Sequence, residues 1–249
     1  MRKKAIIISI KGTTLTKKEK LLLSKEKPWG LILFKRNIKS FSQIKKLTLD
    51  IRKYAKDNKF PILIDEEGAN VSRLSDIINH QINANFFGNI FHYNKQIGIH
   101  LYKTYLKSLC KFLRQIGINI NTIPVLDVLR AKTNKIIGNR AFSNKKKIVK
   151  ILGEVTVKEC HSHKVISVIK HIPGHGCSAK DSHIGMPRIK LSENNLNKMD
   201  FYPFKFTSAK LAMTAHLLYS KIDSKNVSTL SEKIIKNIIR KKIGFKGII

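Results

Sequence analysis

Short apolar runs alternate with amphipathic stretches along the chain. The runs are rich in Ile, Leu and Val and nearly continuous, as expected for strands that are buried on both faces. They predict strands at 5–10, 30–34, 61–65, 118–126, 165–170, 211–215 and 244–249. Because strands and helices alternate, the pattern predicts a parallel α/β fold.

Four of the intervening stretches have the spacing of amphipathic helices. Ser40 is expected to cap the first helix and Ser231 to open the last, while Gly117 and Gly244 follow the ends of the second and the last. The predicted buried faces are Ile44, Leu47, Ile51 and Tyr54; Ile97, Leu101, Tyr105, Leu109, Phe112 and Ile116; Ile148, Ile151, Leu152 and Val155; and Ile235, Ile238 and Ile239.

A doubly wound sheet and a (β/α)8 barrel both fit this alternation. The stretch 11–14 after the first predicted strand matches neither common Gly-rich phosphate-binding fingerprint, which favours the barrel. A complete barrel has eight strands, whereas this pattern predicts six strand–helix units and the beginning of a seventh strand. We find no linker and no internal repeat. Residues 1–249 are therefore expected to form one TIM-type barrel domain that lacks its C-terminal portion.

The composition fits a globular protein. The chain has 249 residues, of which 42% are hydrophobic, and no apolar run approaches the roughly 18 residues of a membrane span. The apolar run 5–10 follows a basic start but is too short for a signal peptide, so a first buried strand is the better interpretation. Cys110, Cys160 and Cys177 are too few for a disulfide framework, and a reducing, cytoplasmic location is expected.

The charge is extreme, because 49 basic and 16 acidic residues give a net charge of +33. Such a charge suggests a polyanionic partner. The lysines are scattered over every predicted helix, however, and no aromatic platform or nucleic-acid motif accompanies them. Nucleic acid is therefore not expected as the main partner, although polyanion binding stays an alternative. The cluster 160–163 lacks a second pair of ligands at a fixed spacing, so no metal or cofactor is expected.

Few carboxylates lie where a barrel would place its chemistry. In parallel barrels the active-site residues gather at the carboxyl ends of the strands. Six acidic residues lie at or just after predicted strand ends: Asp65, Glu66, Glu67, Asp127, Asp181 and Asp223.

The densest group of polar residues is the loop 170–183, which contains three histidines, two lysines and an aspartate. Asp181 and His183 flank a single residue, so in an extended loop the carboxylate can reach the imidazole. This contact fixes the tautomer and raises the basicity of the histidine, which suits proton transfer near neutral pH. Taken alone, an Asp-x-His pair is more often part of an ordinary surface loop.

The stretch 170–176 followed by 181–183 resembles the signature of bacterial β-N-acetylhexosaminidases of glycoside hydrolase family three, which recycle cell-wall fragments. The resemblance spans nearly the whole chain. Further matching stretches, in order, are 30–37, 64–68 with Val71 and Arg73, 138–143, 213–216, 229–231 and 244–247.

The resemblance implies a role for each matching position. His183 would be the general acid/base and Asp181 would orient and polarise it, whereas most retaining glycosidases use a carboxylic acid there. The residues implied to bind the hydroxyls of N-acetylglucosamine are Asp65, Arg73, Arg140, Lys170 and His171. Charged donors and acceptors suit that task because charge-assisted hydrogen bonds are the strong ones. The implied substrates are peptidoglycan-derived muropeptides that end in β-linked N-acetylglucosamine.

Two stretches depart from the family pattern. Ala69-Asn70 replaces a glycine and an arginine of the third-strand motif, and Ala69 is expected to strain a turn that needs a positive φ. Asn139 stands where the family often has aspartate, which is expected to loosen the support of Arg140.

Retention of configuration also needs a nucleophile. The resemblance places it at an aspartate just after the seventh strand, and the sequence stops at 247–249, inside that strand. The resemblance therefore implies a chain truncated before its nucleophile. Two hypotheses follow: a retaining hydrolase with a histidine acid/base, or a catalytically inactive sugar-binding fragment of the same family. A phosphorylase stays open as well, because a histidine acid/base leaves room for an anionic acceptor.

Overall fold

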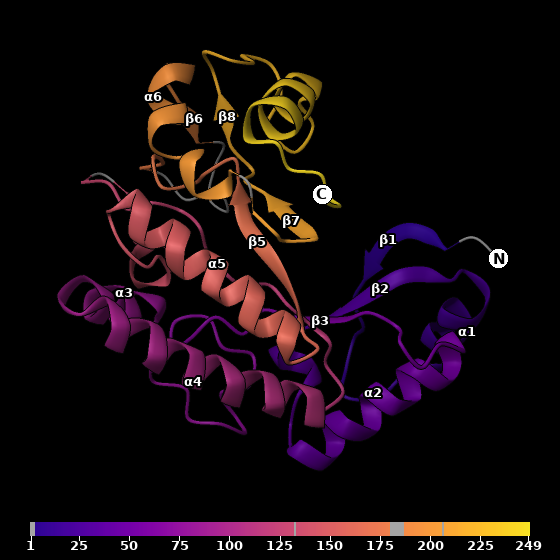
Figure 1. Cartoon of the computed structure of the whole chain (residues 1–249). Helices are drawn as coiled ribbons and strands as arrows, with labels where there is room; N and C mark the ends of the chain where they lie inside the picture. Colours follow the sequence, from indigo (N-terminus) through magenta and orange to yellow (C-terminus); the bar gives the residue numbers. More distant parts are fainter. Residues whose placement is uncertain (1–2, 132, 180–186, 206) are drawn as a thin grey trace.

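A curved sheet of six parallel strands forms the centre of the protein (Figure 1). The computed structural model describes residues 3–131, 133–179, 187–205 and 207–249. The strands lie in the order β1-β2-β3-β4-β5-β7, and each neighbouring pair is parallel, which confirms the predicted α/β class. Their bounds are β1 Lys4–Ile8, β2 Pro28–Leu33, β3 Ile62–Ile64, β4 Ile120–Asn121, β5 Ile166–Ile172 and β7 Leu211–Thr214.

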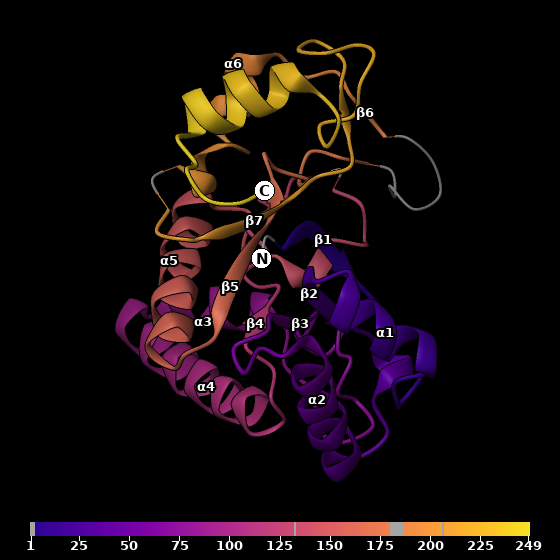
Figure 2. The same ribbon diagram turned by 90° about the vertical axis from the view of Figure 1, so that its right-hand side faces the viewer.

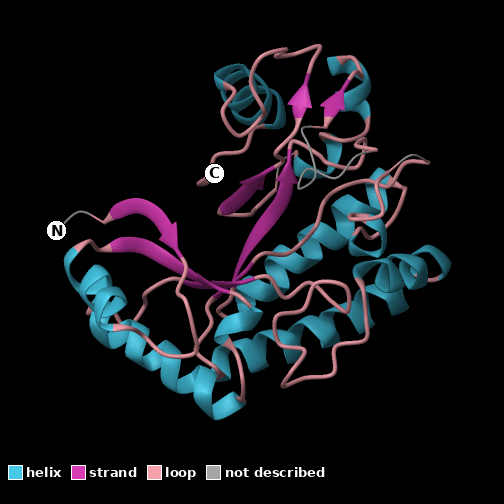
Figure 3. Cartoon of the chain, turned by 180° about the vertical axis from the view of Figure 1, so that it is seen from behind, coloured by secondary structure: helices cyan, strands magenta, loops and turns pink. Residues whose placement is uncertain are grey.

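Helices lie along the outer, convex side of this sheet. Helices α1 and α2 follow the β1–β3 half, and α4 and α5 follow the half that contains β5 (Figures 2 and 3). The helices are α1 Lys17–Lys25, α2 Phe41–Ala55, α3 Ala84–Tyr93, α4 Lys95–Gln115, α5 Lys146–Ser162 and α6 Glu193–Lys198, with the π-type helix η4 Ile234–Ile243. Shorter elements are the 3-10 turns η1 Lys35–Asn37, η2 Gly138–Arg140 and η3 Tyr202–Phe204, and the paired strands β6 Arg188–Ile189 and β8 Leu218–Tyr219.

The four predicted helices are present, and within the described residues three further ones, α1, α3 and the short α6, were not predicted. The Ser40 hydroxyl caps α2 by accepting from the Gln43 N–H, and Gly117 has a φ of +81° just beyond α4. Helix α1 was missed although Thr16 and Glu19 form a reciprocal capping box at its start. Helix α3 was missed as well. Its N-cap residue, Asn83, makes no capping hydrogen bond through its side chain.

The buried face of α4 agrees with the prediction only in part, because Leu109 and Ile116 are buried as predicted but the start of the face is not. Ile97 is 52% exposed and Leu101 is 41% exposed, whereas the buried positions include Tyr102, Leu106 and Leu113. The helix packs against both α3 and α5, so two neighbours on the same outer layer set its buried face, which departs from the predicted stripe at Ile97 and Leu101.

The sheet has the shape of part of a barrel wall. Strand β1 forms one edge, and at the other edge the Ala212 N–H donates to the Ile248 carbonyl over 2.9 Å. The segment 244–249 thus contributes one parallel bridge to Leu211 rather than the predicted strand. The concave side is lined by Leu63, Val168 and Leu211 among other apolar residues. The six parallel strands of an incomplete barrel are confirmed, and the segment predicted to begin the seventh forms a single bridge.

Strand β4 is much shorter than the predicted strand 118–126. Regular pairing ends at Asn121, and Pro124 lacks the N–H that would continue it. Contact with β5 resumes when the Leu126 N–H donates to the Lys170 carbonyl over 2.6 Å. This segment therefore still follows β5 and delivers Asp127 next to the end of that strand.

Among the described residues, no helix combines the length and apolar character that a membrane span needs.

Candidate functional site

A pocket of about 440 Å³ lies at the carboxyl ends of β3, β5 and β7. Its lining includes every sugar-binding residue that the sequence predicted: Asp65, Arg73, Arg140, Lys170 and His171. Residues that are up to 106 positions apart in sequence thus meet at one face, because parallel strands all end on the same side of the sheet. The predicted catalytic pair, Asp181 and His183, lies outside the described residues.

Lys170 is the centre of the charged network. It is a residue of β5, and its side chain is only 2% exposed. Its Nζ donates to Thr122 Oγ1 over 2.8 Å and to Asp65 Oδ1 over 3.3 Å, and it forms an ion pair with Glu67. An ammonium group this deeply buried is tolerable only because carboxylates and hydrogen bonds compensate its lost hydration.

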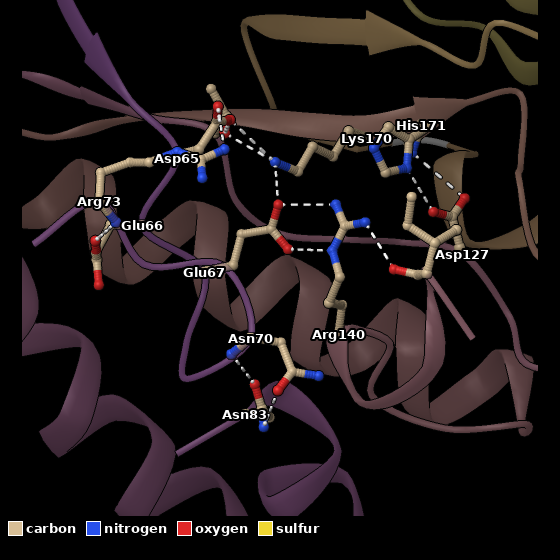
Figure 4. Close-up of polar contacts among 12 residues, drawn as sticks. Asp65, Glu66, Glu67, Asn70, Arg73, Asn83, Asp127, Arg140, Lys170 and His171 are labelled. Atoms are coloured by element: carbon tan, nitrogen blue, oxygen red, sulfur yellow. Dashed lines mark hydrogen bonds and ion pairs between the residues drawn. The ribbon is translucent and has the colours of Figure 1, made fainter. Parts of the chain in front are cut away.

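Glu67 joins Lys170 to Arg140 (Figure 4). The guanidinium of Arg140 donates to both oxygens of Glu67, over 2.7 and 2.9 Å, and also to the Ile136 carbonyl over 2.9 Å. Burial raises the pKa of Glu67, but Lys170 and Arg140 outweigh burial and hold that pKa below its ordinary value. The carboxylate therefore stays charged. Asn139 instead accepts from the Asn85 side chain, so its replacement of aspartate leaves Arg140 firmly supported, contrary to expectation.

Asp65 and Arg73 make a looser pair on the other side of the pocket. The Arg73 Nη2 atom lies 3.5 Å from Asp65 Oδ2, and Asp65 also accepts from the Thr122 hydroxyl. Burial raises the pKa of Asp65, but the charge of Lys170 and the hydrogen bond from Thr122 outweigh burial, so the pKa lies below its ordinary value. The Nε atom of Arg73 is buried and has no hydrogen-bond partner among the described residues. Since a buried donor left unpaired is costly, this nitrogen is suited to a ligand oxygen.

His171 is oriented by a carboxylate behind it. Its Nδ1 lies 2.6 Å from Asp127 Oδ2, and the His175 N–H donates to the other oxygen over 2.6 Å. Burial raises the pKa of Asp127, but His171 more than offsets burial, so the pKa is lowered. The ionised carboxylate only accepts, and the imidazole therefore donates through Nδ1 and leaves Nε2 for other partners.

The turn after β3 avoids the strain that the sequence suggested. Its positive φ, +155°, falls on Gly68, where a Cβ would lie 2.5 Å from the Ile82 carbonyl oxygen. Ala69 is not among the residues with positive φ, so the expected strain at Ala69 is wrong. Asn70, which replaces an arginine, is bonded reciprocally to Asn83 over 3.0 and 3.3 Å (Figure 4).

Three members of this site were not assigned a role from the sequence: Glu67, Asp127 and Thr122. The two carboxylates had a signal, since both were recognised as lying at strand ends. Their pairing with Arg140 and His171 depends on contacts across 73 and 44 residues. Within the described residues, no group of three or more His, Cys, Asp or Glu side chains could hold a metal ion.

Comparison with known proteins identifies the family. Residues 3–249 match the glycosyl hydrolase family 3 N-terminal domain. The chain belongs to this family. It is 33% identical to β-hexosaminidase A of Pseudoalteromonas piscicida, covering 95% of this chain and 42% of that protein. It is 31% identical to a β-hexosaminidase of Nitrosomonas eutropha, covering 98% of this chain and 70% of the relative.

Solved structures of family 3 members agree with this assignment. Native NagZ from Neisseria gonorrhoeae superposes with a TM-score of 0.92 at 30% identity, over 99% of this chain and 72% of that one. The same enzyme in complex with N-trifluoroacetyl-D-glucosamine gives a TM-score of 0.90 at 30% identity, over 99% and 73%. The chain thus spans less than half of one curated relative and roughly seven-tenths of others.

Proposed function

We propose that the pocket binds the terminal N-acetylglucosamine of a β-linked substrate, as the sugar site of a β-N-acetylhexosaminidase. The observation that carries this proposal is the set of charged groups that converge on the pocket, with the buried Nε of Arg73 lacking a partner within the described chain. Sugar hydroxyls donate and accept at once, so adjacent carboxylates and cations match them. A related NagZ is known in complex with N-trifluoroacetyl-D-glucosamine, which supports this choice of ligand.

For catalysis we propose a retaining route in which His183 protonates the glycosidic oxygen and Asp181 orients that histidine. The natural substrates in this proposal are peptidoglycan-derived muropeptides in the cytoplasm. A nucleophilic carboxylate is also required. The two carboxylates that line the described pocket, Asp65 and Glu67, are both engaged in ion pairs with cations. This engagement favours sugar binding without turnover as the second candidate function of residues 1–249.

A titration with N-trifluoroacetyl-D-glucosamine, followed by the fluorine resonance, tests the sugar site directly. We expect saturable binding that unlabelled N-acetylglucosamine displaces and glucose does not. Absence of binding would contradict the proposal. An aryl β-N-acetylglucosaminide then separates the two candidates: turnover that His183→Ala abolishes supports the hydrolase, whereas binding without turnover supports the sugar-binding fragment.

A further inference from the structure

Glu66 is a carboxylate at the edge of the pocket that the proposed sugar chemistry does not use. It follows Asp65 directly, but its side chain is fully buried and is not among the residues that line the pocket. Burying a carboxylate without solvent requires several compensating hydrogen bonds. The identity of those partners indicates what Glu66 does.

Two of the partners are backbone groups of the pocket wall. Glu66 Oε2 accepts from the N–H of Arg73 over 2.8 Å and from the N–H of Leu74 over 3.1 Å. The backbone of Glu66 is held in turn, because its own N–H donates to Asn121 Oδ1 over 3.0 Å. The backbone position of Arg73 is therefore set by a carboxylate seven residues earlier, anchored to β4.

The third partner extends the network to helix α4. His80 Nδ1 lies 2.6 Å from Glu66 Oε1, and the side chain of His80 is only 6% exposed. Because a carboxylate only accepts, Nδ1 carries the proton, and Nε2 accepts from the Tyr105 hydroxyl. Burial raises the pKa of Tyr105 and the charge of Glu66 raises it further, so the phenol keeps its proton to donate.

The consequence falls on Arg73 more than on any other pocket residue. Its guanidinium lies 3.5 Å from Asp65 and 6.0 Å from the centre of the Phe34 ring, two weak contacts, and its Nε has no hydrogen-bond partner among the described residues. Side-chain contacts therefore do little to fix it. Small displacements of a binding group weaken a charged hydrogen bond. The position of the Arg73 guanidinium therefore depends on its backbone, which Glu66 holds.

We propose that Glu66, His80 and Tyr105 form a positioning chain that holds the backbone of Arg73 and thereby sets the affinity of the pocket for the amino sugar. This inference rests on the proposed function for its effect on sugar binding. Its effect on the Arg73 backbone is independent of any ligand.

The first test compares two substitutions of Glu66. Glu66→Ala removes both acceptors, and we expect the Kd for N-trifluoroacetyl-D-glucosamine to rise at least about 10-fold, the loss of one charged hydrogen bond. Glu66→Gln keeps one oxygen that can accept from both backbone N–H groups, and its Kd is expected to stay within about threefold of the parent. A residue that merely stabilised the fold would lower the melting temperature in both variants without this difference in Kd.

A second pair of variants covers the case in which Glu66→Ala does not fold. Tyr105→Phe removes the hydroxyl that donates to His80. The matched control is Tyr102→Phe, on the same helix, whose buried hydroxyl contacts Thr156 in α5 over 2.9 Å and lies outside the chain of bonds to Arg73. Both variants lose one buried phenol hydrogen bond, but only Tyr105→Phe is expected to raise the sugar Kd, by about threefold or more.

Amide hydrogen exchange at Arg73 and Leu74 separates this inference from the proposed function. We expect faster exchange of both amides in Tyr105→Phe than in the parent or Tyr102→Phe, with or without sugar. Faster exchange in Tyr105→Phe, combined with a parent protein that binds no sugar, would support the positioning chain and reject the sugar site. Unchanged exchange and an unchanged Kd in Tyr105→Phe would overturn the inference.

Discussion

Arg73 and Arg140 face the same pocket, yet they are held in opposite ways. The guanidinium of Arg140 is occupied by both oxygens of Glu67 and by the Ile136 carbonyl. That of Arg73 forms one long ion pair, at 3.5 Å from Asp65, and lies 6.0 Å from the centre of the Phe34 ring, while its backbone N–H donates to Glu66. Their side chains are 13% and 30% exposed for Arg140 and Arg73 respectively.

This difference indicates how one pocket can combine rigidity with binding capacity. A bidentate, buried guanidinium fixes the wall, because its donors are already satisfied and moving it would expose Glu67. A guanidinium with free donors can bind a ligand, provided that its backbone is fixed independently. Two arginines of one pocket can thus have different roles: Arg140 stabilises the wall, and Arg73 is available to bind a ligand.

The largest effect is expected from Arg140→Met, which keeps the apolar stem and removes the charge. Among the described residues, Glu67 would keep Lys170 as its one paired cation while remaining buried, and we expect the free energy of unfolding to fall by about 3 kcal/mol. Urea unfolding at neutral pH measures this change. Arg114→Met, at the exposed end of α4, is the matched control, and an Arg140 variant as stable as this control would contradict the structural role.

Arg73→Met should have the reverse profile. We expect unfolding free energy to change by less than about 1 kcal/mol, because the pair with Asp65 is long and partly exposed. The Kd for N-trifluoroacetyl-D-glucosamine should rise about 10- to 100-fold, the range for one charged hydrogen bond. Fluorine-detected titration beside the Arg114→Met control measures it. Equal losses of affinity and stability in Arg73 and Arg140 variants would remove the distinction between the two arginines.

The pH dependence of stability sharpens the comparison on the Arg140 side. The pKa of Glu67 is lowered in the folded state from its ordinary 4.5. A lowered carboxyl pKa contributes stability that is complete above the ordinary value and lost as pH falls through the folded value. Urea unfolding between pH 7 and pH 3 should therefore show a smaller acid loss for Glu67→Gln than for the parent. Parallel curves for the two proteins would refute a charged, paired Glu67.

The smallest effect is expected from Asn139→Asp, which restores the residue that the family often carries. Arg140 already has both terminal donors engaged, and Asn139 is exposed and bonded to Asn85. We expect a change of no more than about 0.5 kcal/mol in unfolding free energy, as for an exposed charge. A gain well above that value in urea unfolding would mean that Glu67 alone supports Arg140 poorly.

The sequence was sufficient to predict which strands carry the polar residues of the pocket at their carboxyl ends. Buried strands have continuous apolar runs, and the polar residues at the carboxyl ends of β3 and β5 carried both positional and family signals. Features that depend on packing between elements distant in sequence were less predictable. The face of α4 depended on α3 and α5, and strand β4 was shortened at Pro124.

By itself, then, the sequence determined the α/β class, the family and the five charged residues that line the pocket, because these depend on local periodicity and on a specific motif. Only the tertiary structure decided the partners of those residues. Glu67 pairs with Arg140, Asp127 orients His171, and Glu66 holds the backbone of Arg73 while His80 links it to α4. Each pairing follows from burial: a charged group removed from water binds whichever complementary group the packed chain brings within reach.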